Sequence, residues 1–285
     1  ENQIHMPSVV QARRQLAAVE KSMGPVHLAR SAEEHGGPHE PWFWDPTQQG
    51  GGVCCDMGCH SVAVGMYTLT PGGKPPDYLT PVSVTASMAL LKWGKEPWIS
   101  WLKERGVDYT AAPAEDYSNV TLEFKDPEAG VRSIAQATNS WMYDAPGLRL
   151  LMEAFGPGYS YTVNSLESPA GLFISDAAAA AVADSELALE KAQATRGALV
   201  LQPNEPDLYG YIAEWRDAIS AFERGEDALL DFQYGRLITM LVMAAYMSHE
   251  KKKTVDLTDS AVLEALESYV PLIQQGRGAE VLRGV

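Results

Sequence analysis

The stretch from Gly50 to His60 holds the residue types that could do chemistry. Three consecutive glycines precede Asp56 and His60, which stand four residues apart in an expected helix over residues 53–69. Side chains at positions i and i+4 project from one face of a helix. A carboxylate one turn from an imidazole can fix its tautomer and raise its basicity, as a proton-abstracting histidine requires near neutral pH. The spacing predicts an acid/base pair, and a pair that only satisfies itself near the core is the structural alternative.

Aromatic residues flank this stretch in a pattern that is typical of carbohydrate sites. The glycines would let the backbone approach a ligand closely. Aromatic faces beside polar groups can hold the C–H face of a sugar ring together with its hydroxyls. We therefore predict substrate contacts from the loop over residues 35–45 and from a later strand end, through His39, Trp42, Trp44, Trp141 and Tyr143. The alternative is that these side chains form an apolar plug under the loop or belong to the core.

The cysteines favour packing over metal binding. Cys54, Cys55 and Cys59 lie within six residues, followed by His60. The resulting C-C-x-x-x-C-H run matches no standard zinc-ligand spacing, so we expect no metal site. An odd, crowded set of cysteines is also a poor disulfide framework and fits a reducing compartment, with the cytoplasm as the expected location.

The elements that must position these residues alternate along the chain. Helical periodicity is found over residues 7–23, 53–69, 176–194, 211–223, 231–248 and 260–274. Strand patterns are found over residues 26–30, 82–86, 119–124, 131–137, 148–155 and 159–164, with a hairpin turn at 126–130. This order predicts an α+β fold, a large, mostly antiparallel open sheet with helices on one face. We expect the uncovered face to be apolar and to form a homo-oligomer.

Composition excludes several classes of partner. The chain has 285 residues, of which 46% are hydrophobic and 21% charged, as in a soluble globular protein. Its formal charge of -15 disfavours nucleic acid and anionic membranes as partners. No apolar run approaches the roughly 20 residues that span a bilayer, and the first residues do not resemble a signal peptide. The same formal charge disfavours a large anionic substrate, with a local basic pocket as the open alternative.

Several motifs together resemble the Gfo/Idh/MocA oxidoreductase family. Its C-terminal domain carries a G-G-G-x-x-x-D-x-G-x-H signature, which residues 50–60 match at every fixed position. The run G-P-H-E-P-W-F-W-D over residues 37–45 is similar to that of one bacterial subgroup, and Glu115-Asp116 is similar to the family's E-D strand. The likeness extends from residue 1 to about residue 257.

The resemblance implies a large antiparallel sheet that follows a Rossmann domain, and hydride transfer between NAD(P) and a hydroxyl of a sugar, glycoside or inositol. His60 would be the acid/base residue, and Asp56 would bind the substrate hydroxyl and orient His60. Residues 1–6 would be the remnant of the last Rossmann strand, with Asn2 and Gln3 near the cofactor. Residues 7–285 would form the substrate-binding, catalytic and oligomerisation domain.

The sequence departs from the family pattern at its front. It contains neither a G-x-G-x-x-G turn between a strand and a helix nor an E-K-P motif. NAD or NADP would therefore be bound mainly by an N-terminal domain missing from this chain. Two alternatives stay open, a carbohydrate-binding or oligomerisation module without cofactor and a family member that uses recycled NAD for glycoside cleavage or isomerisation.

Overall fold

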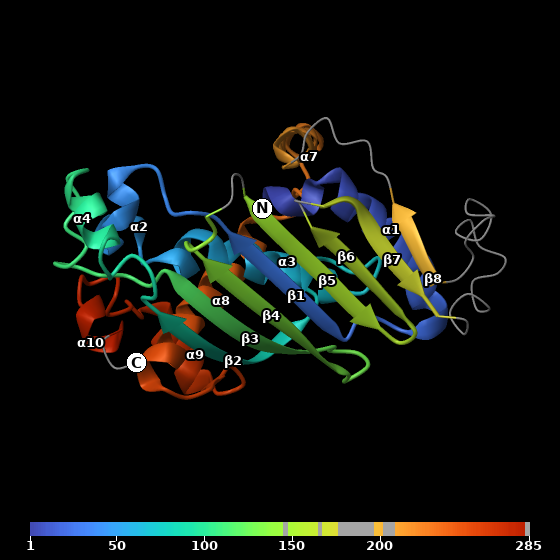
Figure 1. Ribbon diagram of the computed structural model, residues 1–285. Coiled ribbons are helices and arrows are strands. Elements are labelled where there is room, and N and C mark those ends of the chain that lie inside the picture. Colours follow the sequence, from blue (N-terminus) through green and yellow to red (C-terminus); the bar gives the residue numbers. More distant parts are fainter. Residues whose placement is uncertain (145–147, 165–166, 176–196, 202–208, 283–285) are drawn as a thin grey trace.

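The computed structural model describes residues 1–144, 148–164, 167–175, 197–201 and 209–282 (Figure 1). The helix expected over residues 176–194 lies outside the described residues. The described strands are β1 (Leu28–Glu34), β2 (Thr80–Ala89), β3 (Tyr117–Lys125), β4 (Arg132–Ser140), β5 (Arg149–Gly156), β6 (Tyr159–Asn164), β7 (Glu167–Ile174), β8 (Gly197–Leu201) and β9 (Val255–Asp256). They form one sheet in the order β8-β7-β6-β5-β1-β4-β3-β2-β9.

Every neighbouring pair of strands in this sheet is antiparallel except β1 and β4, which run parallel. The hairpin predicted around residues 126–130 is present as β3 and β4, and Asp126 closes the turn by accepting from the amides of Glu128 and Ala129. The predicted fold class, a mostly antiparallel open sheet with helices, is confirmed.

Three of the described helices, α1 (Pro7–Met23), α3 (Cys59–Leu69) and α8 (Phe232–Lys251), cover one face of the sheet (Figure 1). The other described helices are α2 (Pro46–Gln49), α4 (Trp98–Lys103), α7 (Tyr211–Arg224), α9 (Ser260–Glu267) and α10 (Gly278–Leu282), with 3-10 helices at Asn2–His5 and Pro41–Trp44 and a π-helix at Cys54–Gly58. Figure 1 shows α1, α3 and α8 behind the strands, where α1 contacts β6 and β7, α3 contacts β1, β4 and β5, and α8 contacts β2.

The core lies between these helices and the alternate, inward-facing residues of the strands. Small side chains let α3 approach the sheet closely. A Cβ on Gly65 of α3 would lie 3.1 Å from the Cβ of Ala135. Two polar contacts fix α3 at the same place, since the Ser61 carbonyl accepts from Ser31 Oγ at 2.6 Å and Ser61 Oγ accepts from Asn139 Nδ2 at 2.7 Å. The helix that begins at Cys59 is thereby held at a fixed height above β1 and β4.

The open face of the sheet is mainly polar, and the expectation of an apolar face is wrong. Nε of Arg30 donates to Gln136 Oε1 at 3.0 Å across the parallel pair β1 and β4, and Arg132 forms an ion pair with Glu123. Ile134 is an exception, 42% exposed. Antiparallel sheets can present such a polar face to water, because their side chains alternate between the two faces.

The N-terminal residues also differ from the sequence-based expectation. Asn2–His5 form a 3-10 helix rather than the end of a strand, and the side chain of Glu1 caps it by accepting from the Gln3 amide. The C-terminal helix expected over residues 260–274 ends early, at Glu267. The short helix α4 was not predicted, because Trp98–Lys103 is too brief to show a periodic pattern.

Candidate functional site

A cavity of about 990 Å³ lies where β1 ends and the aromatic loop begins. It brings together the predicted Asp56 and His39 with side chains that the sequence analysis did not select. These further lining residues include Glu33, His35, Lys92, Trp93, Trp98, Trp101 and Asp144. Acidic, basic and aromatic groups therefore share one concave surface, the usual arrangement of a small-molecule site.

Asp56 and His60 do not form the direct pair that their spacing predicts. Asp56 lies within the π-helix Cys54–Gly58, and His60 lies just beyond it in α3. A π-turn is wider than an α-turn, so the i, i+4 spacing of a regular helix does not describe this segment. Each side chain has other partners, and π-turns of this kind often occur at functional sites.

His60 is paired with Glu1. Its Nδ1 lies 2.6 Å from Glu1 Oε2, and the imidazole is 31% exposed. Burial alone would lower the pKa of His60, but the contact with the Glu1 carboxylate outweighs it and raises this pKa to about 9. The pKa of Glu1 is lowered, since contact with His60 and its charge overcome the effect of burial. Because Nδ1 is engaged, Nε2 is the nitrogen able to exchange a proton with a ligand.

Asp56 accepts a hydrogen bond from Trp141 and faces His35. Trp141 Nε1 donates to Asp56 Oδ2 at 3.0 Å, and His35 Nε2 lies 3.8 Å from the same oxygen. Burial raises the pKa of Asp56. Burial, with the nearby charge of His39, lowers the pKa of His35 to about 4. His35 is therefore neutral at pH 7, and because its Nδ1 accepts from the Gly37 amide at 3.0 Å, its proton resides on Nε2, toward Asp56.

Glu33 is a buried carboxyl group that the sequence analysis missed. It is the sixth residue of β1, 7% exposed, and Gln3 Nε2 donates to its Oε2 at 2.6 Å. Burial raises the pKa of Glu33 to about 7, partly offset by the charge of His60. Glu33 lines the same cavity as Asp56, so the site contains a second carboxyl group able to change protonation near neutral pH. The alternating strand pattern places Glu33 on the inner face, which was the available signal.

Two of the three glycines before Asp56 are packed closely against other parts of the chain. A Cβ on Gly51 would lie 2.2 Å from Tyr246 Oη, and a Cβ on Gly52 would lie 2.2 Å from the carbonyl oxygen of Glu115. Oε1 of Glu115 accepts from the Gly52 amide at 3.1 Å, the Cys54 amide at 3.0 Å and Tyr246 Oη at 2.6 Å. This fully buried carboxyl group therefore holds the start of the helical segment that carries Asp56 and His60.

Asp116, which follows Glu115, fixes the backbone of residues 91–93, and Lys92 and Trp93 of this turn line the cavity. Its carboxylate accepts from the amides of Leu91 at 2.6 Å, Lys92 at 2.7 Å and Trp93 at 2.8 Å. Successive side chains of an extended segment point in opposite directions, so Glu115 and Asp116 can reach different parts of the site. The E-D pair recognised in the sequence thus fixes both the glycine segment and the turn at Lys92.

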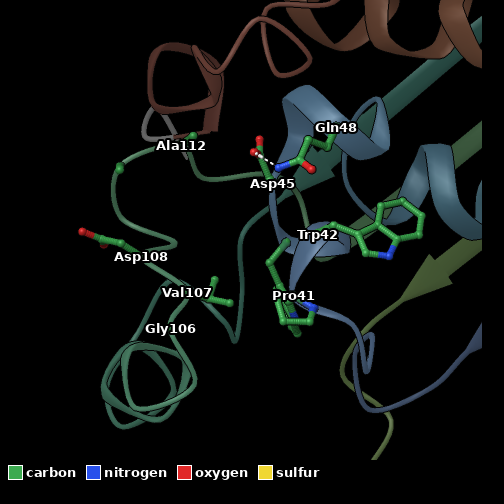
Figure 2. A pocket seen from close by; sticks show the side chains of 10 residues that line it. Pro41, Trp42, Asp45, Gln48, Gly106, Val107, Asp108 and Ala112 are labelled. Carbon is green, nitrogen blue, oxygen red and sulfur yellow. Dashed lines mark hydrogen bonds between the residues drawn. The ribbon is translucent and has the colours of Figure 1, made fainter.

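The residues predicted to contact the substrate do not line one common cavity. Trp141 and Trp44 are buried, 0% and 4% exposed, and their rings pack edge-on with centroids 5.3 Å apart. Trp42 and Trp44 line a second cavity of about 500 Å³, shown in Figure 2 between Pro41–Gln48 and the loop over residues 106–112. Tyr143 lines neither cavity, and its amide donates to the His35 carbonyl. His39 alone of the five lines the cavity of Asp56.

Asn2 and Gln3, predicted to lie near a cofactor, both contact other parts of this chain. Asn2 Nδ2 donates to the Tyr209 carbonyl at 2.7 Å, and Gln3 donates to Glu33 as described. Their side chains are 6% and 4% exposed. Their role toward a cofactor stays a prediction.

The described residues do not fit a dinucleotide. A pyrophosphate requires glycine amides open to the ligand at a helix N-terminus, whereas those of Gly52 and Cys54 are directed at Glu115. Among the described residues no group of three His, Cys, Asp or Glu side chains is placed to hold a metal ion, and no helix is long and apolar enough to cross a membrane. Cys54, Cys55 and Cys59 are free, and burial raises the pKa of each thiol.

Solved structures share this fold. GenD2 from gentamicin A biosynthesis, in complex with NAD, is 23% identical with a TM-score of 0.61 over 90% of this chain and 62% of its own. Levoglucosan dehydrogenase with NADH and levoglucosan is 16% identical with a TM-score of 0.62 over 90% and 64%. A putative myo-inositol dehydrogenase from Sinorhizobium meliloti 1021 is 19% identical with a TM-score of 0.55 over 90% and 64%.

This chain therefore spans less than two thirds of the length of these three proteins. No curated protein matches the sequence. A family model described as the GFO/IDH/MocA C-terminal domain matches residues 9–156, just over half of the chain, and includes both the glycine segment and the E-D pair. The chain belongs to the Gfo/Idh/MocA family.

Proposed function

We propose that this chain is the substrate-binding and catalytic part of an NAD(P)-dependent oxidoreductase that acts on a hydroxyl of a sugar, glycoside or inositol. The observation that carries the proposal is the ion pair of His60 with Glu1, because the charge of His60 acts on Asp56 and Glu33, which line the cavity. Such a pair gives an imidazole a defined tautomer and a perturbed pKa, both of which acid/base catalysis requires.

In this proposal the chain handles the proton of the reaction. Nε2 of His60 exchanges a proton with the substrate oxygen, and Asp56 accepts a hydrogen bond from a substrate hydroxyl. With its pKa raised to about 9, His60 is an imidazolium at neutral pH. The resting site is therefore ready to protonate an oxygen, and removal of a proton from a hydroxyl requires His60 to be deprotonated first.

The proposal assigns the dinucleotide to a part of the protein outside residues 1–285. Support comes from the solved structures of the same fold with bound NAD or NADH, of which this chain covers 62% and 64%. Whether the nucleotide is NAD or NADP is left to experiment. The proposal places the protein in the cytoplasm, in keeping with three free cysteines.

We further propose a homo-oligomer through the open sheet face. Because that face is mainly polar, the contact would consist of hydrogen bonds and ion pairs around Ile134. Sedimentation of the chain across a concentration series tests this proposal. A monomer at all concentrations, or an oligomer that Ile134→Glu leaves intact, would contradict it.

The catalytic proposal is tested by joining this chain to a family nucleotide-binding domain and following NAD(P)H absorbance with sugars and inositols as substrates. We expect turnover that rises with pH as His60 loses its proton, and a fall of roughly 10²–10⁴ in kcat for His60→Asn. Oxidation that proceeds at the same rate in this variant would remove His60 from the mechanism.

A further inference from the structure

We propose that the outer part of the 990 Å³ cavity is a second sugar subsite, so that the substrate is a disaccharide or another glycoside whose first ring lies at Asp56. The second ring would lie against Trp98 and Trp101 and receive hydrogen bonds from Lys92. This inference rests on the proposed function and specifies its substrate class.

A series of contacting tryptophans leads outward from Asp56, and three of them, Trp93, Trp98 and Trp101, line the cavity. Trp141 donates to Asp56, and its carbonyl oxygen accepts from Trp93 Nε1 at 2.8 Å. The ring of Trp93 then contacts Trp98 and Trp101, with centroid distances of 5.2 and 5.5 Å. Exposure rises along this series, from 0% at Trp141 and 3% at Trp93 to 37% at Trp101. The three tryptophans of the cavity lining therefore extend from a buried position at Trp93 to the surface at Trp101.

The ring of Trp101 is held by a neighbouring side chain. The guanidinium of Arg105 stacks 3.5 Å from the ring centroid of Trp101, and Arg105 is not among the residues that line the cavity. The face of Trp101 that borders the cavity is thereby left to a ligand. Aromatic faces of this kind bind the C–H face of a sugar, and a fixed ring binds it with a smaller loss of side-chain entropy.

Lys92 supplies the polar group of the subsite. It is 8% exposed, and its ammonium lies 4.8 Å and 4.4 Å from the ring centroids of Trp93 and Trp98. Its Nζ lies 2.5 Å from Asp144 Oδ1, and its backbone amide is held by Asp116. An ammonium has three N–H donors, so the pair with Asp144 leaves donors for ligand hydroxyls. Nothing in the mechanism at His60 uses this buried lysine.

Volume and charge narrow the class of ligand. Ligand cavities of about 300–1,000 Å³ hold drug-sized molecules, and this one, at about 990 Å³, lies at the upper end. Its charged lining includes the carboxyl groups of Glu33, Asp56 and Asp144 against the single ammonium of Lys92. The negative charge of a sugar phosphate or a uronic acid would be repelled by this acidic lining. A neutral glycoside therefore fits the cavity better.

The experiment measures dissociation constants by isothermal titration of the 285-residue chain. The probes are the methyl glycosides of glucose, galactose and mannose, and disaccharides composed of the same sugars. We expect at least one disaccharide to bind about tenfold or more tightly than the methyl glycosides of its two sugars. Trp101→Ala and Lys92→Met should remove most of this advantage while leaving methyl glycoside affinity unchanged.

Two controls guard against an unfolded variant and a nonspecific effect. Trp215→Ala removes a tryptophan that is 64% exposed on α7, away from this cavity, and should retain the disaccharide advantage. Trp101→Phe keeps an aromatic face, so it should retain part of the advantage, and circular dichroism checks that each variant is folded. Equal affinity for both classes of sugar, or an equal loss for both classes in Trp101→Ala, would overturn the inference while the proposed function stood. No binding of any sugar would overturn both.

Discussion

Replacement of Glu1 by glutamine should lower the pKa of His60 strongly. The carboxylate of Glu1 is the principal group that raises this pKa, because it lies 2.6 Å from Nδ1, while burial acts in the opposite direction. Glutamine keeps the size and hydrogen-bonding capacity of the side chain but removes its charge. The imidazolium would then face burial with the charges of Glu33 and Asp56 in its favour.

The size of the expected pKa change follows from the pKa of His60 with and without its partner Glu1. The pKa of His60 is about 9 with Glu1 in place, against an ordinary value of 6.5. Full loss of the pair would move the pKa down by more than two pH units, or about 3 kcal/mol at ~1.36 kcal/mol per unit. At pH 7.5 the imidazolium fraction would fall from about 97% to about 9% or less.

The same pair makes folding stability depend on pH. A histidine whose pKa is higher in the folded chain stabilises it fully below its unfolded pKa and loses that contribution as pH rises through the folded pKa. For His60 the window runs from 6.5 to about 9. Glu1, whose folded pKa is lowered from 4.5, loses its contribution as pH falls below that value. The pair therefore stabilises the chain most at pH values between these two windows.

The assay is an NMR titration of the imidazole signals of wild type, Glu1→Gln and a matched control, Glu40→Gln, which removes a carboxylate on the cavity rim that is not paired with His60. We expect His60 to titrate near pH 9 in wild type and in the control and below pH 7 in Glu1→Gln. A wild-type pKa close to 6.5, or the same pKa in both Glu1 forms, would refute this account of the site.

Three further predictions concern the framework of the site and are measured by urea unfolding of each variant. Glu115→Ala should destabilise the chain by about 3 kcal/mol, because it leaves buried donors unpaired. Glu115→Gln keeps an accepting oxygen and should lower the free energy of unfolding much less. Equal losses in the two variants would contradict the assigned hydrogen bonds. Gly52→Ala should cost ~3 kcal/mol or more through overlap with backbone, and Gly235→Ala, in open space within α8, should instead stabilise by about 0.5–1 kcal/mol. Asp116→Asn should shift the fluorescence of the Trp93 cluster along with lowering stability, and an unchanged spectrum would show that Asp116 does not position the turn.

Most strands and helices could be predicted from the local periodicity of apolar and polar residues. Alternation of apolar and polar residues marked β3 and β4, and apolar spacing marked α8, for which the structure adds an N-cap at Asp231. These elements are determined by side-chain periodicity, so sequence alone locates them. The polarity of the open face was misjudged because periodicity shows that two faces differ without showing which side chains pair across strands. Arg30 and Gln136 are more than a hundred positions apart in sequence.

Of the residues predicted for the site, Asp56 and His39 line the cavity, and the geometry around them could not be predicted. Asp56 and His60 were identified by their motif, but the π-turn that separates them has no signature in composition. Glu33 and Lys92 were missed because a single charged residue in a strand or turn is usually solvent-exposed, and only tertiary packing buries these two. The partner of His60, Glu1, is remote in sequence, so helical spacing pointed to Asp56 instead.

The most direct test of the central claim is isothermal titration of this chain with NAD, NADP and a panel of sugars, glycosides and inositols, for wild type and Asp56→Asn. We predict that at least one sugar or inositol binds, that Asp56→Asn weakens it, and that neither nucleotide binds measurably. Tight binding of NAD or NADP, or the absence of any sugar binding, would contradict the account of this chain as a substrate-binding and catalytic part.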